Sequence, residues 1–186
     1  MIGFEEKGPI NTEESCKIAI QKAIELSTDI VFPTTSGDSA VLLCQMAKIM
    51  GFNNRIVIVT HAYGFKEPGI NSLTEENRKT IEEHGAKIVT ATHSLSGVER
   101  AMSAKFGGVY PVEIIAHTLR MFSQGVKVVV EISSMALDAG AIEYGKQVVC
   151  LGGTSSGIDT VVVMTPAYGN NLFTTKINEL LCMPKN

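Results

Sequence analysis

Apolar runs and amphipathic segments alternate along this 186-residue chain. Segments with apolar residues three and four positions apart, the spacing of one helix face, separate runs that are apolar almost throughout. Such runs are typical of strands buried on both faces, and helices between them imply a parallel sheet covered on both sides. The predicted strands are "DIVFPT" (29–34), "RIVIVT" (55–60), "AKIVTAT" (86–92), "KQVVCLGG" (146–153) and "DTVVVMTPA" (159–167). We therefore expect an α/β fold, with three α/β/α layers and about five strands.

The last two apolar runs depart from the parallel pattern. Only the short segment "TSSGI" separates them, whereas a crossover between parallel strands takes a dozen residues or more. The last strand is therefore predicted to be antiparallel in a mainly parallel sheet. The tail that follows, "YGNNLFTTKINELLCMPKN", is predicted to pack one short helix against the domain.

Residues 126–140 are ambiguous from their pattern alone. The β-branched start of "VKVVVEISSMALDAG" favours a strand. The same residues also carry an apolar stripe at helical spacing. The pattern alone is compatible with both a strand and a helix. Residues 93–108 are also ambiguous, with a short helix over residues 98–106 as one interpretation. A helix is predicted over residues 110–125, with Pro111 suited to its first turn.

Composition narrows the class of protein. A content of 45% hydrophobic and 19% charged residues, without repeats or linkers, predicts one globular domain over residues 1–186. The net charge of −3 gives no electrostatic basis for binding nucleic acid. No apolar run approaches the roughly 20 residues that span a bilayer, and the acidic N-terminus lacks a secretory signal. We expect a cytoplasmic protein with neither nucleic-acid nor membrane partners; a homo-oligomer and a monomer stay open.

Cysteine and histidine show no spacing that suggests a metal site. The four cysteines lie far apart without a CxxC pair, and the four histidines share no ligand spacing. We expect no metal and buried, reduced thiols.

Ligands of open α/β sheets bind beyond the carboxyl ends of the strands, where three polar segments are predicted to emerge. The first, "TTSGDS" (34–39), joins a strand to a helix. Its glycine lets the backbone approach a ligand, its hydroxyls donate, and the helix N-terminus favours an anion. A phosphate site is one interpretation. The other is that Ser36 or Asp38 only caps the helix, and the Asp38 carboxylate would compete for the same donors.

The other two segments follow the second and fourth predicted strands. In "HAYGFKEPG" (61–69), Tyr63 and Phe65 offer flat apolar surfaces, His61 offers a donor, and Glu67 a candidate acid or base. This loop is longer than usual, which favours a role in ligand binding. A surface loop whose aromatic residues close over the core would explain the same residues. The segment "GGTSSG" (152–157) could hold a polar group or serve only as a hairpin loop.

These segments together resemble the C-terminal domain of pyruvate kinase. The likeness lies in "AIELSTDIVFPTTSGDSA", "RIVIVT", "HGAKIV" and "YGKQVVCLGGTSSGIDTVVVMTP", in that order, and covers about two thirds of the chain. The sequence of the catalytic barrel is missing, so we expect no pyruvate kinase activity. The chain is similar to the stand-alone, largely uncharacterised archaeal and bacterial proteins of this type. The resemblance implies a long helix at residues 126–140, and we adopt that helix.

Some of these proteins are associated with bound flavin mononucleotide (FMN), which the resemblance implies here as the cofactor. Thr34, Ser36, Gly37 and Ser39 match the corner that holds a sugar-phosphate effector in pyruvate kinases, whereas Asp38 departs from it. We expect the phosphate at residues 35–39 and the flavin ring near the strand ends. The predicted cofactor-binding residues are Thr34, Thr35, Ser36, Gly37, Asp38, Ser39, His61, Tyr63, Gly64, Phe65, Gly152, Gly153 and Thr154.

Two functions from different classes are compatible with this site. The first is an FMN-binding protein that acts as a flavin-dependent oxidoreductase on an unidentified substrate, with His61 and Glu67 as candidate proton-transfer groups. The second is a non-catalytic sensor or regulatory module that binds a phosphorylated metabolite. In both, the partner is a small phosphorylated molecule.

Overall fold

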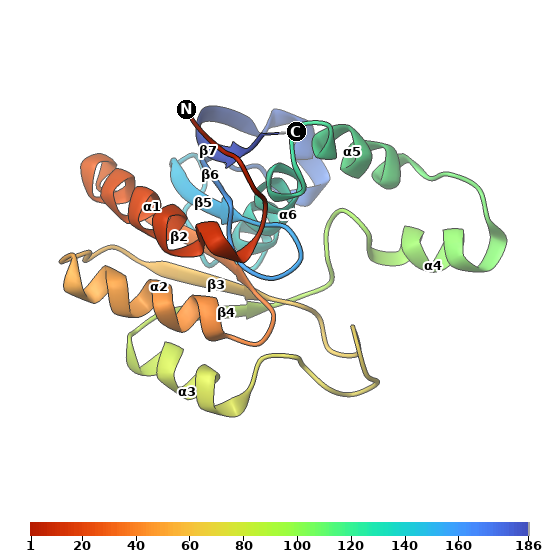
Figure 1. The fold of residues 1–186 in the computed structure, drawn as a ribbon. Helices are drawn as coiled ribbons and strands as arrows, with labels where there is room; N and C mark the ends of the chain where they lie inside the picture. The colour runs from red at the N-terminus through yellow and green to blue at the C-terminus, as the bar shows by residue number, and fades with distance from the viewer. Residues whose placement is uncertain (186) are drawn as a thin grey trace.

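The computed structural model describes residues 1–185, and a seven-stranded sheet in the order β1-β7-β6-β5-β2-β3-β4 forms its centre (Figure 1). The strands are β1 (Ile2–Phe4), β2 (Asp29–Thr34), β3 (Ile56–Thr60), β4 (Lys87–Thr90), β5 (Val148–Gly152), β6 (Thr160–Thr165) and β7 (Lys176–Pro184). Strands β2 to β5 are the first four strands predicted from the apolar runs. The predicted α/β class is confirmed.

The direction of β6 also confirms the prediction made from its short connection. β5 pairs in parallel with β2, and β6 pairs antiparallel with β5, with Val149 opposite Val163. β7 runs antiparallel to β6 and so returns to the common direction, and β1 lies parallel to it. One strand of the described sheet therefore opposes the other six.

The edge formed by β1 and β7 was not predicted. The tail forms one short helical segment, the 3₁₀ segment η2 (Gly169–Thr174), which contacts α6. The rest of the tail forms β7, a strand that was not predicted, and pairs with β6. The first four residues of β7 are exposed, so this strand lacks the continuous apolar run by which buried strands are recognised.

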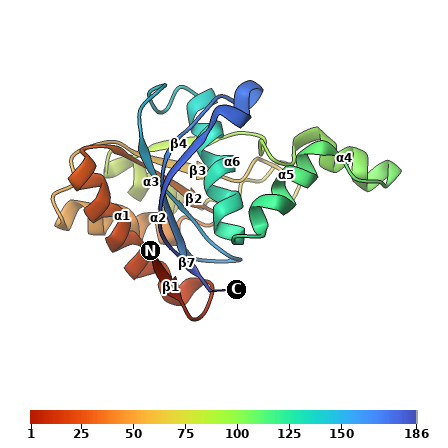
Figure 2. The same cartoon turned by 90° about the horizontal axis from the view of Figure 1, so that it is seen from above.

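Helices cover both faces of the sheet, as Figure 2 shows along its edge. One core cluster joins α1, α2 and α3 to side chains such as Phe32 and Ile58, and the other joins α5 and α6 to Val31 and Val57. The alternation of neighbouring residues between the two clusters is that of strands buried on both faces. The helical segments are η1 (Pro9–Asn11), α1 (Thr12–Leu26), α2 (Asp38–Ile49), α3 (Glu75–Glu83), α4 (Gly97–Phe106), α5 (Pro111–Arg120) and α6 (Gln124–Asp138).

The ambiguous segment at residues 126–140 is helical, as the resemblance implied. The Ser123 side chain caps α6 by accepting a hydrogen bond from the Val126 N–H at 3.0 Å. Nearly every residue of α6 is buried, because the helix lies between the sheet and α5. Burial of its valines against β2, β3, β5 and β6 outweighs the small helix penalty of β-branched residues.

Helix α4 differs from the others because it has no buried residue. Figures 1 and 2 both show it projecting beyond α5, away from the sheet. A hollow lined by residues of α4, α5 and α6 lies between α4 and the body of the protein. None of the helices in residues 1–185 is both long enough and apolar enough to cross a membrane.

Candidate ligand-binding site

A cavity of about 560 Å³ opens at the carboxyl ends of the central strands. Its lining includes Thr34 at the end of β2, Thr60 at the end of β3 and Gly153 just after β5, so the three polar segments meet at one edge. The volume is in the range of small-molecule sites. We call it the strand-edge cavity.

One end of the strand-edge cavity is the turn between β2 and α2. Gly37, with φ 109°, begins α2 and donates its N–H to the Thr34 hydroxyl at 3.1 Å. Because glycine has no side chain, no side-chain cap occupies the N–H groups of the first turn. Those groups carry the positive end of the helix dipole and can bind an anion.

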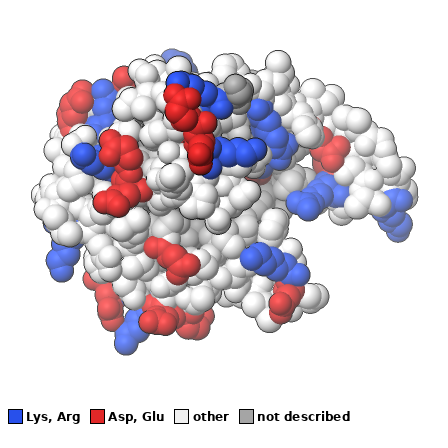
Figure 3. Space-filling view, viewed as in Figure 1, with Lys and Arg blue, Asp and Glu red and all other residues white. Residues whose placement is uncertain are grey.

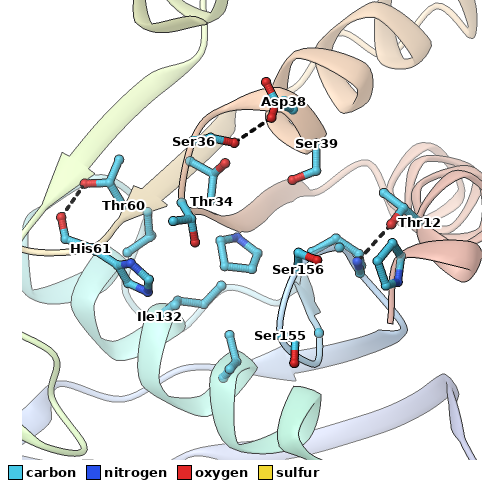
Figure 4. A pocket seen from close by; sticks show the side chains of 18 of the residues that line it. Thr12, Thr34, Ser36, Asp38, Ser39, Thr60, His61, Ile132, Ser155 and Ser156 are labelled. Carbon is cyan, nitrogen blue, oxygen red and sulfur yellow. Dashed lines mark hydrogen bonds between the residues drawn. The ribbon is translucent and has the colours of Figure 1, made fainter. Parts of the chain in front are cut away.

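Asp38 does not cap this helix. Its carboxylate accepts hydrogen bonds from the Ser36 hydroxyl at 2.7 Å and the Asn77 amide at 2.8 Å, and these bonds lower the pKa of Asp38 below its usual value. Figure 4 shows Asp38 and Ser36 at the outer side of the turn, with Ser39 closer to the cavity interior. The carboxylate therefore leaves the backbone donors of α2 open.

Gly37 is required by packing rather than by the cavity. A Cβ at this position would lie 2.4 Å from Asn77 Cβ and 2.7 Å from a Leu73 methyl carbon, both on the α3 side of the turn. The glycine lets the turn and α3 come together. Substituting it therefore tests the packing of α3 before it tests ligand binding.

The loop between β5 and β6 forms the opposite side of the strand-edge cavity. Ser155 and Ser156 line it, and Figure 4 shows both across the cavity from the turn at Ser39. The Ile158 N–H donates to the Thr12 hydroxyl at 3.0 Å, which ties the loop to the start of α1. A Cβ on Gly153 would lie 2.0 Å from the Gly157 carbonyl oxygen, so the loop is closed tightly on itself.

His61 lies at the far end of an apolar wall that includes Val59, Val128 and Ile132. Its Nδ1 is buried and has no hydrogen-bond partner among residues 1–185. Burial, with a smaller contribution from the neighbouring His93, lowers the pKa of His61 to about 4. His61 is therefore neutral at pH 7 and presents a buried nitrogen that a ligand can satisfy.

A buried ion pair on α6 completes the wall beside His61. The Lys127 ammonium lies 2.5 Å from a Glu131 carboxylate oxygen, and the other Glu131 oxygen accepts the Leu95 N–H at 3.1 Å. Both side chains are at most 7% exposed. Sequence reasoning missed this pair, although a Lys and a Glu four residues apart within the apolar stripe of "VKVVVEISS" were a visible signal.

The structure brings together about half of the residues predicted to bind a cofactor. Those that line the strand-edge cavity are Thr34, Thr35, Ser36, Asp38, Ser39, His61 and Gly153. Those outside its lining are Gly37, Tyr63, Gly64, Phe65, Gly152 and Thr154. The proton-transfer candidate Glu67 is exposed and also lies outside the lining.

The aromatic residues of the loop after β3 are placed differently from the expectation that they cover a flavin ring. Tyr63 is 61% exposed, and Phe65 stacks on His61 with ring centroids 4.0 Å apart rather than lining the cavity. Aliphatic side chains provide the flat wall instead. Among residues 1–185, no three or more His, Cys, Asp or Glu side chains come together as a metal site would need.

The arrangement can bind a molecule that has an anion at one end and an apolar body. Backbone N–H groups and hydroxyls serve the anion, and aliphatic side chains cover the body. Among the cavity side chains described, the Ser36 hydroxyl donates to the exposed Asp38 carboxylate, and His61 is neutral at pH 7.

Comparisons with known proteins identify the family. Over residues 13–164 the chain matches the family model described as pyruvate kinase, alpha/beta domain. Among solved structures, it is similar to O-acetyl serine sulfhydrylase isoform 3 from Entamoeba histolytica, with 14% identity and a TM-score of 0.31. That match covers 70% of this chain and 46% of the sulfhydrylase, so the chain spans under half of its length. By the family match, the chain belongs to the pyruvate kinase alpha/beta domain family.

Proposed function

We propose that the protein binds FMN in the strand-edge cavity, with the phosphate at the N-terminus of α2. The observation that carries the proposal is the pairing of an uncapped helix N-terminus with an aliphatic wall in one cavity of about 560 Å³. Phosphate groups bind at such termini, and flat apolar rings bind against such walls.

The residues present are compatible with the parts of FMN. Ser39 stands beside the first turn of α2 as a hydroxyl donor for the phosphate, whereas the Ser36 hydroxyl donates to Asp38. Ser155 and Ser156 offer hydrogen bonds to the ribityl hydroxyls, and Val59, Val128 and Ile132 cover the ring. His61 lines the same cavity, and its buried Nδ1 has no hydrogen-bond partner among residues 1–185.

A flavin-dependent oxidoreductase is the finer form of this proposal. Bound FMN supplies the ability to take up and release electrons. His61 is adopted as the candidate proton-transfer group, because it lines the cavity and is neutral at pH 7. Glu67, exposed and outside the lining, is not adopted for this role.

The first experiment is an absorbance spectrum of the purified protein, followed by titration with FMN and with riboflavin. We expect flavin absorbance or, after its removal, rebinding of FMN that is stronger than binding of riboflavin, which lacks the phosphate. A colourless protein that ignores added FMN would overturn the proposal.

A variant that adds a negative charge to the first turn of α2 tests whether the phosphate binds there. Ser39→Asp puts a carboxylate in the first turn of α2, where it stabilises the helix and repels a phosphate. We expect FMN affinity to fall at least about tenfold while riboflavin affinity changes little. Asn53→Asp is the matched control, since it adds the same charge at an exposed position near the amino end of β3. Equal effects of the two variants would show that the phosphate lies elsewhere.

A sensor of a phosphorylated metabolite is the second candidate. The hydroxyls of Thr12, Ser155 and Ser156 face the phosphate end and favour a polyhydroxylated sugar phosphate as strongly as a ribityl chain. A ligand that binds only the folded state raises the melting temperature. Thermal-shift measurements with sugar phosphates and with FMN therefore separate the two candidates.

A further inference from the structure

A second cavity, of about 330 Å³, lies between α4, α5 and α6. It adjoins the strand-edge cavity along a shared wall, whose residues line both cavities: His61, His93, Gln124, Val128 and Glu131. We call it the arginine cavity, because Arg100 of α4 and Arg120 of α5 line it. Figure 3 shows the hollow between the projecting α4 region and the body of the protein, with Lys and Arg side chains at its rim.

The four arginines of the chain fall into two groups. Outside the cavity, Arg55 pairs with Asp29, and Arg78 pairs with two glutamates of its own helix. Within residues 1–185, neither Arg100 nor Arg120 has a carboxylate partner at ion-pairing distance. In a protein with a net charge of −3, the two arginines without carboxylate partners therefore line the same cavity.

The carboxylates of the arginine cavity are already engaged by other groups. Glu131 accepts from Lys127 and from the Leu95 N–H. Glu113 accepts from the Ser103 hydroxyl at 2.7 Å and from the Tyr110 N–H at 3.2 Å. Neither is within 4.0 Å of a guanidinium nitrogen. The positive charge of the two arginines is therefore left for a ligand.

Other contacts orient the two guanidinium groups. Arg120 donates through Nε to the Gln124 side-chain oxygen at 2.7 Å. Arg100 lies over the Phe65 ring, 5.8 Å from its centroid, and the same ring stacks on His61. Gln124 and His61 both belong to the shared wall, so each guanidinium is linked to the boundary between the two cavities. Such restraint lowers the entropy lost when an anion binds.

We propose that the arginine cavity is a second ligand site, which binds a carboxylate or phosphate group of a small molecule through Arg100 and Arg120. Guanidinium groups match the geometry of both oxyanions, and two of them in one cavity of this size suit one such group. A molecule held there lies against His61 and the shared wall, so it is adjacent to whatever occupies the strand-edge cavity. The proposal does not depend on the identity of that first ligand.

Residue-resolved NMR provides the test. The probes are inorganic phosphate and malonate, added separately to the uniformly ¹⁵N-labelled protein at low salt. We expect shifts of the Arg100 and Arg120 Nε–H signals and of the Ser96 and Ala116 amides, which lie in the cavity wall. A larger response to phosphate identifies phosphate esters as the preferred class, and a larger response to malonate identifies carboxylates.

Three variants make the test specific. Arg100→Gln and Arg120→Gln remove one guanidinium each, and each is expected to weaken binding at this cavity by about tenfold to a hundredfold. Arg100 is exposed on α4, so its loss leaves the fold intact. Arg55→Gln removes an arginine at the amino end of β3, away from the carboxyl ends of the strands. It is expected to leave the anion affinity of the arginine cavity unchanged.

Three outcomes would overturn the proposal. One is shifts confined to the first turn of α2, which would place the anion in the strand-edge cavity alone. Another is equal weakening by Arg55→Gln and Arg100→Gln, which would indicate general charge screening. The last is an affinity weaker than about 10 mM for both probes at low salt.

Discussion

The two cavities share a wall but offer different groups to an anion. In the strand-edge cavity, backbone N–H groups and hydroxyls at strand ends supply the donors, and the Asp38 carboxylate beside them is turned outward. In the arginine cavity, the guanidinium groups of Arg100 on α4 and Arg120 on α5 supply the donors. The first arrangement binds an anion through dipoles fixed by the backbone, whereas the second depends on long side chains held by their neighbours.

This difference determines what substitutions can reveal. Removing one hydroxyl from the strand-edge cavity leaves the helix dipole in place, so single deletions there have small effects on binding. Removing one guanidinium from the arginine cavity eliminates half of its available charge.

Breaking the buried ion pair of the shared wall has the largest expected effect. Lys127→Met leaves Glu131 as a buried charge without its partner, which is expected to lower the free energy of unfolding by about 3–5 kcal/mol. Urea denaturation measures the loss. Lys79→Met removes the corresponding partner of Glu83 in an exposed pair of the same spacing on α3 and is expected to cost less than about 1 kcal/mol.

The double variant Lys127→Met, Glu131→Leu completes this test. Replacing a buried pair by apolar residues of similar volume is often neutral, so most of the lost stability is expected to return. A double variant as unstable as the single one would mean that the Glu131 bond to the Leu95 N–H, rather than the pair, holds the wall.

The strand-edge cavity was more predictable from the sequence than the arginine cavity. A polar turn after an apolar strand and before a helix has one place in a parallel sheet, so Thr34, Ser39 and Gly153 could be assigned to one edge. Arg100 and Arg120 lie on separate helices, and their meeting depends on how α4 and α5 pack. Helix periodicity places a residue on a face but does not say what that face meets.

The strand β7, which was not predicted, has a similar origin. Its residues lack a continuous apolar run, and its pairing with β6 joins segments that local sequence does not bring together. The start of α6 looked like a strand from its valines, although Ser123 three residues before Val126 was a local helix signal. Local capping was thus more informative there than β-propensity.

The turn at α2 provides the next largest effect. Gly37→Ala combines a left-handed backbone with a Cβ only 2.4 Å from Asn77 Cβ, and we expect a loss of about 2–4 kcal/mol in the free energy of unfolding. Gly51→Ala is the matched control, because Gly51 also has positive φ but open space around it. Its expected cost is about 1 kcal/mol, from backbone strain alone. Equal losses would contradict the packing role of Gly37.

The shared wall also predicts a pH dependence of stability. The pKa of His61 is about 4 in the folded protein and about 6.5 in an unfolded chain. Between these values the unfolded chain binds the proton first, so this contribution to stability is complete above pH 6.5 and is lost as the pH falls toward 4. We expect a loss of about 1–3 kcal/mol over that window.

Chemical denaturation at several pH values between 5 and 7 measures this slope, and His61→Gln is expected to flatten it. His84→Gln removes a histidine outside both cavities and serves as the control. A slope that survives in His61→Gln would assign the pH dependence to other groups, including the His93 imidazole, whose pKa burial also lowers.

Asp38 provides the smallest and most specific comparison between the cavities. Asp38→Asn removes the one negative charge beside the N-terminus of α2 while keeping an acceptor for Ser36 and a group of the same size beside Asn77. Because Asp38 is exposed, the change in the free energy of unfolding is expected to stay below about 1 kcal/mol.

Phosphate affinity of the Asp38→Asn variant at the strand-edge cavity is expected to rise severalfold at low salt, and the gain is expected to shrink as salt screens the charge. At the arginine cavity the same variant is expected to change nothing, since Asp38 is not in its lining. Equal gains at both cavities would mean that net charge, rather than the local arrangement at α2, governs how this protein attracts anions.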